Sequence, residues 1–264
     1  TELLSGQGIH RNTKERGCCI VSFLKGYEIK NTTETSADLY FYGDIVSDWW
    51  GAWQDEDQYP DAIKNFLSAQ GGKDLNVYVN SGGGSVFAGI AIYNMLKRHA
   101  QKNTVNVYVD GLAGSIASLL PFAGSEPPEI PSNAFFFVHN PSCPLDGNAQ
   151  AHRKMADDLD QIREGIINIY AEHMKEGVTI EEIKALMDNE TWLNGHQAAE
   201  YFNIRTTEAK EYAASLGDYL KANCKEVPEE FKEKRIGSVK TPVDKRKEKL
   251  NKVKALVLQG ITKD

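Results

Sequence analysis

The sequence predicts an α/β domain with a mainly parallel sheet, and three observations support this prediction. Short apolar runs typical of buried strands alternate with segments whose apolar residues recur at helical spacing. Turn residues such as those at 80–85 and 110–111 separate these runs. The chain has 264 residues, of which 41% are hydrophobic, which is enough to form one substantial core. Strands and helices that alternate around one core indicate a parallel sheet covered by helices.

The expected elements of the first half follow this alternation. Strands are predicted at 38–42, 75–79 and 104–109, where β-branched and aromatic residues are frequent. Helices are predicted to begin near Pro60 and after the glycine-rich segment 80–85. The second of these helices should reach about Ala100, because its apolar residues recur at amphipathic spacing.

The second half continues with a small-residue helix from Ser115 and a strand at 134–138 that ends at His139. A long helix is expected at about 148–175, with a narrow apolar stripe. Two capping boxes predict the starts of two short helices, which should end near Asp188 and Phe202; the boxes pair Thr179 with Glu182 and Asn194 with Gln197.

Composition limits the domain organisation and the class of partner. The net charge of −7 argues against a nucleic-acid-binding surface. No run reaches the roughly 18 to 20 apolar residues that span a bilayer, and the four cysteines fit a reducing compartment, so we expect a cytoplasmic protein without a membrane partner. We expect three parts in the chain. Residues 1–25 are an N-terminal extension of foreign or processed origin, residues 26–222 form one catalytic domain, and residues 223–264 form a charged tail.

Three sites could together supply nucleophilic catalysis. Ser115 follows a strand and begins a helix among small residues, which lets a substrate backbone approach it closely. The glycine-rich turn at 80–85 can point free N–H groups outward, as an oxyanion hole requires. His139 ends a strand, where functional groups gather in parallel sheets. Taken singly, each has a more ordinary structural interpretation, such as close packing, a simple turn or a core histidine.

Taken together, the blocks at 80–89, 111–118 and 138–141 resemble those of the Clp protease proteolytic subunit family, in the same order and with similar spacing. The resemblance covers about 38–204 and is strongest to the phage and prophage branch. It implies that Ser115 is the nucleophile, that His139 is the general base, and that the backbone N–H groups of Gly84 and Ile116 form the oxyanion hole.

The third catalytic residue differs from the family pattern. The family usually has Asp where this chain has Glu190, and Asp188 stands two residues earlier. Glutamate can orient an imidazole if its backbone lies farther from the histidine by about the length of one methylene group. The resemblance therefore implies Glu190 as the third catalytic residue, with Asp188 as the alternative.

The resemblance also implies a fold and an assembly. The fold would be the Clp/crotonase-type spiral of ββα units, with the long helix as a protruding handle between stacked rings of a homo-oligomer. The activity would be serine endopeptidase cleavage of peptides or proteins through an acyl-enzyme, without cofactor or metal. Expected partners are phage capsid or scaffold proteins or a Clp-type ATPase, although no N-terminal segment resembling the family's axial loops is found.

Two other functions and one other substrate class stay open. General Clp-like degradation is the alternative to capsid processing within the same chemistry. A crotonase-type acyl-CoA enzyme would share the fold but would not need Ser115 paired with His139. A non-catalytic oligomeric capsid-assembly protein would keep the fold as a shell.

The remaining reactive or aromatic residues are interpreted structurally. Trp49, Trp50 and Trp53 are expected to pack in the core or a lid rather than to bind substrate. Cys143 is expected to be buried or inert. The histidines other than His139 show no metal-ligand spacing and are expected at the surface or in caps, at positions 10, 99, 152, 173 and 196.

Overall fold

The computed structural model of the chain describes residues 29–30, 32–48 and 57–209. Within these ranges the fold is mixed α/β, with one eight-stranded sheet that is mostly parallel. The predicted fold class is therefore confirmed at this level. The expected extension at 1–25 and the expected tail at 223–264 lie outside the described residues.

Five parallel pairings form the body of the sheet, and antiparallel pairings occur between β1 and β2 and between β6 and β7. The main path runs β1-β2-β3-β4-β5-β8. The strands of this path are Ile29–Lys30, Ser36–Phe41, Asp74–Ser81, Val105–Gly114, Glu129–Pro131 and Arg205–Thr207.

Strand β4 changes partner along its length. Its first half pairs with β5 at Tyr108, whereas its second half, from Leu112 to Gly114, pairs with β6 (Phe135–Val138). Strand β6 in turn pairs with β7 (Thr191–Asn194). This branch brings the C-terminal ends of β4 and β6 side by side, and Ser115 and His139 follow those two ends.

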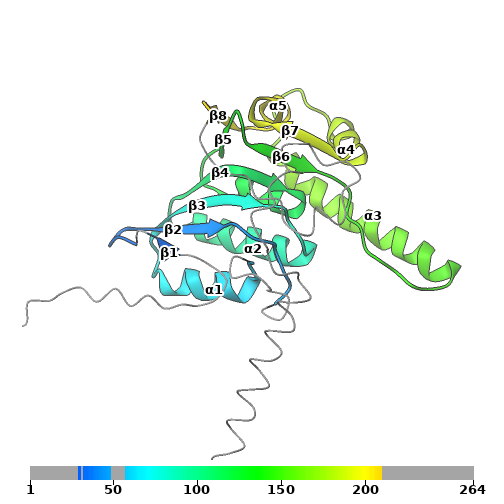
Figure 1. Ribbon diagram of the computed structural model, residues 1–264, viewed down its shortest axis with the longest axis horizontal. Helices are drawn as coiled ribbons and strands as arrows, with labels where there is room; N and C mark the ends of the chain where they lie inside the picture. The colour runs from blue at the N-terminus through cyan, green and yellow to red at the C-terminus, as the bar shows by residue number, and fades with distance from the viewer. Residues whose placement is uncertain (1–28, 31, 49–56, 210–264) are drawn as a thin grey trace, which may run out of the picture.

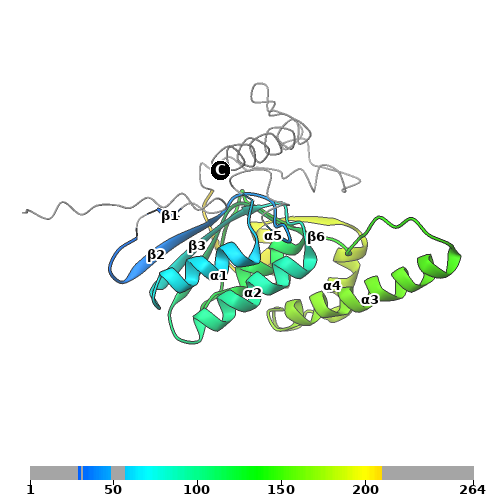
Figure 2. The ribbon, with the colours of Figure 1, turned by 90° about the horizontal axis from the view of Figure 1, so that it is seen from below.

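Helices α1 (Pro60–Ala69) and α2 (Val86–Ala100) cover one face of the sheet (Figures 1 and 2). Proline at the first position of α1 fits its start, because that N–H has no helical partner. The side chains of Phe66, Ile92 and Leu96 are fully buried beneath the sheet residues Val77 and Val107 in a single core.

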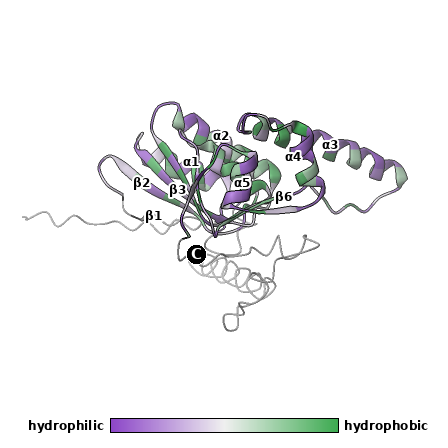
Figure 3. Cartoon of the chain, turned by 90° about the horizontal axis from the view of Figure 1, so that it is seen from above, coloured by the Kyte–Doolittle hydropathy of each residue, from purple (hydrophilic) through white to green (hydrophobic). Residues whose placement is uncertain are grey.

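Helix α3 (Ala149–Ala171) projects away from the sheet, as Figure 1 shows. Asn148 caps its start by accepting from the Ala151 N–H at 3.0 Å. Only its last two turns bury side chains, from Ile166 to Tyr170. Its projecting part carries mainly hydrophilic residues in Figure 3, so most of this helix has no partner within the described chain.

Both predicted capping boxes are present. Thr179 exchanges hydrogen bonds with Glu182 at the start of α4 (Ile180–Asp188), and Asn194 does so with Gln197 at the start of α5 (Gly195–Tyr201). The Thr179 backbone N–H and hydroxyl lower the pKa of the Glu182 carboxyl.

The helix expected from Ser115 is present as η1 (Ser115–Ala123), which is a 3₁₀-helix. Pro121 inside it has no N–H to donate, which disfavours a regular α-helix there. Strands β5, β7 and β8 were not predicted, since each has only three or four residues. Among the described residues no helix is long and apolar enough to cross a membrane.

Candidate active site

Ser115 occupies a strained turn between β4 and η1. Its φ is 52°, in the left-handed region that residues with a side chain rarely adopt. Among the described non-glycine residues only Ser115 and Glu190 have positive φ. Strain of this kind persists where the surroundings enforce it, and it is frequent at functional sites. The two strained residues are therefore candidates for a common site.

His139 lies directly beside this serine. Its Nε2 atom is 2.7 Å from Ser115 Oγ, a hydrogen-bonding distance. The parallel pairing of Gly114 with Phe137 brings the two residues close, because Ser115 directly follows Gly114 at the end of β4 and His139 directly follows the end of β6. For the serine hydroxyl to donate, the imidazole must be neutral with its proton on Nδ1.

The surroundings of His139 favour this neutral form. Burial lowers its imidazole pKa below the usual value, because a cation loses hydration there. The Glu190 carboxylate acts in the opposite direction and raises the pKa by a smaller amount. The imidazole can therefore accept a proton at neutral pH while a carboxylate stabilises the imidazolium that results.

The pairing of β6 with β7 places Glu190 opposite His139. Phe137 faces Trp192 and Val138 faces Thr191 in this antiparallel pair. Continuing the register by one residue brings His139 opposite Glu190. The geometry thus favours Glu190 over Asp188 as the carboxylate that faces the histidine.

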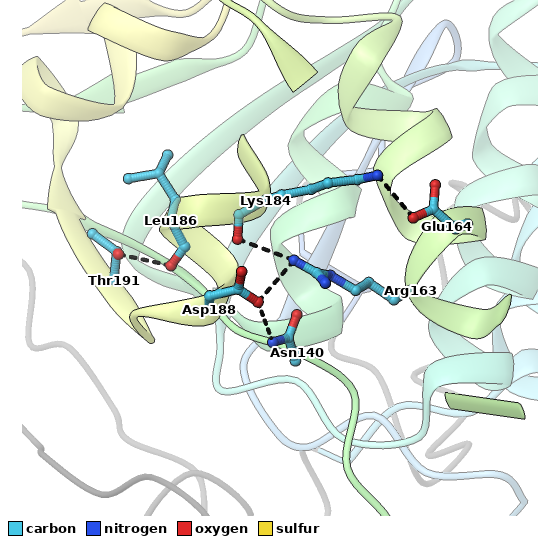
Figure 4. Close-up of polar contacts among 7 residues, drawn as sticks. All are labelled: Asn140, Arg163, Glu164, Lys184, Leu186, Asp188 and Thr191. Atoms are coloured by element: carbon cyan, nitrogen blue, oxygen red, sulfur yellow. Dashed lines mark hydrogen bonds and ion pairs between the residues drawn. The ribbon is translucent and has the colours of Figure 1, made fainter. Parts of the chain in front are cut away.

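Asp188, the alternative third member, contacts other groups. Its Oδ1 atom accepts hydrogen bonds from Asn140 Nδ2 and Arg163 Nη2, both at 2.8 Å (Figure 4). The Asn140 amide and, to a smaller extent, the Arg163 charge hold the pKa of this carboxyl below its usual range. Asp188 therefore stays ionised beside the site.

The glycine-rich loop packs against the serine turn. A Cβ atom placed on Gly83 would lie 2.7 Å from Ser115 Cβ and 3.0 Å from the Ile116 nitrogen. The loop is fixed on its other side by Ile45, whose N–H donates to the Gly83 carbonyl and whose carbonyl accepts from the Ser85 N–H, each at 2.7 Å. Side chains have no room on either side of this loop.

The two expected oxyanion-hole donors lie at this loop and turn. Gly84 has a φ of 138°, which only glycine adopts readily, and a Cβ there would lie 2.1 Å from the Ile45 carbonyl oxygen. Ile116 is in the first turn of η1, where N–H groups lack a partner within the helix. Ile116 directly follows Ser115, and Gly84 directly follows Gly83, which packs against the serine turn.

Sequence reasoning missed the groups that support the histidine. The Phe137 ring stacks on His139 with centroids 5.1 Å apart, and the Trp192 ring stacks on Phe137 at 4.3 Å. Phe137 and His139 are two residues apart in an extended segment, so their shared face could have been read from the sequence. The roles of Ile45 and Arg163 had no local signal, because both are distant in sequence.

Other expectations fall outside the site. Trp49, Trp50 and Trp53 lie outside the described residues. Cys143 was expected to be buried or inert; it is exposed, so the buried alternative is wrong and the inert thiol stays a prediction. His173 is half-buried and stacks on Phe122 with centroids 4.9 Å apart, rather than lying at the surface or in a cap. Within the described ranges no group of His, Cys, Asp or Glu side chains could hold a metal ion.

Comparison with known proteins identifies related sequences. The Clp protease family matches residues 55–205. The chain is 32% identical over 153 residues to the ATP-dependent Clp protease proteolytic subunit 2 of Rhodococcus jostii (strain RHA1), covering 54% of this chain and 76% of that protein. It is 33% identical over 136 residues to subunit 1 of Streptomyces coelicolor (strain ATCC BAA-471 / A3(2) / M145), covering 51% and 60% respectively. The Bacteroides fragilis (strain ATCC 25285) subunit is 29% identical over 154 residues, covering 54% and 72%.

Proposed function

The chain belongs to the Clp protease family, and on this basis we propose that it is a serine endopeptidase in which Ser115, His139 and Glu190 form the catalytic triad. The 2.7 Å contact between Ser115 Oγ and His139 Nε2 is the observation that carries this proposal. A nucleophile and its base need this distance, and a carboxylate must orient the base.

The reaction follows from the positions of these groups. His139 Nε2 takes the hydroxyl proton while Ser115 Oγ attacks the carbonyl carbon of the substrate peptide bond. The N–H groups of Gly84 and Ile116 donate to the oxyanion of the tetrahedral intermediate. The imidazolium then protonates the leaving amine, and a water molecule activated by the same imidazole hydrolyses the acyl-enzyme.

We assign Glu190 the role of orienting the imidazole. Its carboxylate accepts from Nδ1–H, which fixes the tautomer that leaves Nε2 free to take a proton. The register of β6 with β7 and the effect of Glu190 on the His139 pKa support this assignment.

Helix α3 supports a proposal about assembly. Most of its 23 residues project from the domain, yet Met155 and Ile162 on one side remain only partly exposed. We propose that α3 is the handle of the spiral fold and contacts a second copy, so that stacked rings enclose the active sites. Sedimentation of the full chain tests this: a lone monomer at micromolar concentration would contradict it.

The natural substrates are proposed from resemblance to phage-encoded members, as capsid or scaffold proteins, with general degradation as the alternative. Incubation with casein, an unstructured substrate, separates the two. Cleavage at a few sites supports a processing enzyme, whereas conversion to short peptides supports degradation. Addition of a Clp-type ATPase with ATP tests whether a partner is needed for folded substrates.

Labelling with a fluorophosphonate probe tests the chemistry itself. We expect modification at Ser115, mapped by mass spectrometry, and its loss in Ser115→Ala and His139→Ala. If the probe does not modify Ser115 in the assembled wild-type protein, the result would support a non-catalytic capsid-assembly protein. Acyl-CoA hydrolysis that persists in Ser115→Ala would instead support the crotonase-type interpretation.

A further inference from the structure

A cluster of charged and amide groups joins three segments beside the proposed triad (Figure 4). Arg163 Nη2, from α3, donates to Asp188 Oδ1 at 2.8 Å and to the Lys184 carbonyl at 3.2 Å. Asn140 Nδ2 donates to the same Asp188 oxygen at 2.8 Å. One carboxylate oxygen thus holds donors from two other segments, and we call these three side chains the Asp188 cluster.

The segments that the cluster joins carry the base and the acid of the proposed triad. Asn140 directly follows His139, and Asp188 ends α4 two residues before Glu190. The chain between Asp188 and Glu190 turns sharply, because Glu190 has a φ of 49°. Thr191 Oγ1 closes the turn by donating to the Leu186 carbonyl at 2.7 Å.

Stability alone accounts poorly for this cluster. The Asp188 side chain is 54% exposed, and ion pairs at the surface contribute little, with a median of about 0 to 1 kcal/mol. Arg163 Nε and Asn140 Oδ1 are buried without a hydrogen-bond partner among the described residues. Buried polar atoms left unpaired are unfavourable, so the arrangement is better explained by what it positions.

We propose that the Asp188 cluster positions Glu190 against His139, so that Arg163, Asn140 and Asp188 are positioning residues for the reaction. The inference rests on the proposed function, in which Glu190 orients His139. Asp188 fixes the start of the strained turn, Asn140 fixes the chain after the base, and Arg163 anchors both to α3. The alternative third member of the triad thereby acquires a different role.

Neighbouring residues offer a matched control. Lys184 Nζ and Glu164 Oε1 form an ion pair at 3.0 Å between the same two helices, α4 and α3. Glu164→Gln breaks that pair and leaves the cations near Asp188 in place. Arg163→Met breaks the Asp188 cluster, and Arg163→Lys retains its charge and one possible bond to Asp188.

The first readout is the rate at which a fluorophosphonate modifies Ser115. For Arg163→Met and Asp188→Ala we expect the maximal rate to fall about 10- to 100-fold, as misplacement by about 1 Å does, with an unchanged half-saturating probe concentration. Arg163→Lys should recover part of the rate, and Glu164→Gln should equal wild type. The double variant should lose no more than either single variant. Equal rates in Arg163→Met and Glu164→Gln would overturn the inference.

The second readout does not require activity. The NMR titration midpoint of His139 should fall in Arg163→Met, because a displaced Glu190 carboxylate no longer raises the pKa of the imidazole. It should stay unchanged in Glu164→Gln. Failure of the probe to label wild-type protein would reject the proposed function. An unchanged His139 midpoint in Arg163→Met would reject the positioning role of the Asp188 cluster.

Discussion

The Tyr170 hydroxyl lies 2.6 Å from Ser118 Oγ, and this contact ties helix α3 to the turn that carries Ser115. Ser118 Oγ also donates to the Ser115 carbonyl. A serine hydroxyl has one proton, so the Tyr170 hydroxyl must be the donor in its contact with Ser118. Burial raises the pKa of Tyr170, which keeps that proton in place. Two consecutive hydrogen bonds thus hold the strained turn from behind.

Replacing Tyr170 with Phe should destabilise the protein by about 1 to 3 kcal/mol, because buried Ser118 loses its donor. Urea unfolding measures this loss. Tyr93→Phe is the matched control, since that hydroxyl makes only a 3.5 Å contact with His173 Nε2. Equal losses in the two variants would show that the Tyr170 hydroxyl stabilises the protein no more than the weakly bonded Tyr93 hydroxyl does.

Glu190→Gln should change the pH dependence of Ser115 acylation in a defined direction. The rate needs neutral His139, whose pKa burial places below its usual value of 6.5, so acylation should still proceed at pH 6.5 and its acid limb should lie at lower pH. Removing the carboxylate that raises this pKa should move the acid limb to lower pH. The plateau should also fall by at least about 100-fold, since the imidazole loses its orienting acceptor.

The pH profile of probe labelling, measured on wild type, Glu190→Gln and Glu164→Gln, checks this prediction. Glu164→Gln removes a carboxylate of the α3–α4 ion pair and should leave the profile unchanged. An acid limb that stays in place or moves upward in Glu190→Gln would show that another group faces His139.

Much of the fold could be predicted because its signals are local. The helix starts at Pro60, Thr179 and Asn194 depend on residues within one turn, and the structure has them where the sequence places them. The short strand β7 was missed, because its pairing with β6 depends on contacts made far along the chain. The same pairing brings Glu190 opposite His139. The sequence alone therefore left Glu190 and Asp188 as alternatives for the third catalytic residue.

The supporting parts of the site were beyond sequence reasoning for the same reason. Ile45 fixes the glycine loop from a segment 38 or more residues away, as its bonds to Gly83 and Ser85 show. Arg163 reaches Asp188 across 25 positions. Neither residue type is unusual in its local sequence, so only the three-dimensional arrangement reveals what it contacts.

Trp192 should contribute to the rate by supporting His139 through Phe137. Removing the outer ring in Trp192→Leu allows Phe137 to shift, so the imidazole loses the flat surface on which it rests. We expect about a 10-fold lower maximal labelling rate with little change in probe binding. Trp192→Phe keeps a stacking ring and should remain near wild type. A normal rate in Trp192→Leu would limit the stack to packing.

The glycine loop should not tolerate a methyl group. Gly83→Ala and Gly84→Ala combine positive φ with contacts at 2.7 and 2.1 Å to backbone oxygens of Gly114 and Ile45. Each should abolish labelling and lower stability by more than about 2 kcal/mol. Gly165→Ala in α3 meets nothing within 4 Å and should stabilise by about 0.5 to 1 kcal/mol. Stability and labelling of all three variants test the loop geometry.

The strain at Ser115 can be measured separately from its chemistry by comparing two inactive variants. Ser115→Ala keeps a Cβ at a φ of 52°, whereas Ser115→Gly removes it. Glycine avoids the cost of about 1 to 2 kcal/mol that a residue with a Cβ atom has in the left-handed conformation. Glycine also gives the unfolded chain more conformational freedom, which reduces this gain in folding stability by about 0.4 to 1 kcal/mol. Ser115→Gly should therefore be more stable than Ser115→Ala by about 0.5 to 1 kcal/mol in urea unfolding. A more stable alanine variant would mean that the turn relaxes to negative φ in solution, and the contact between Ser115 and His139 would then have to form when substrate binds.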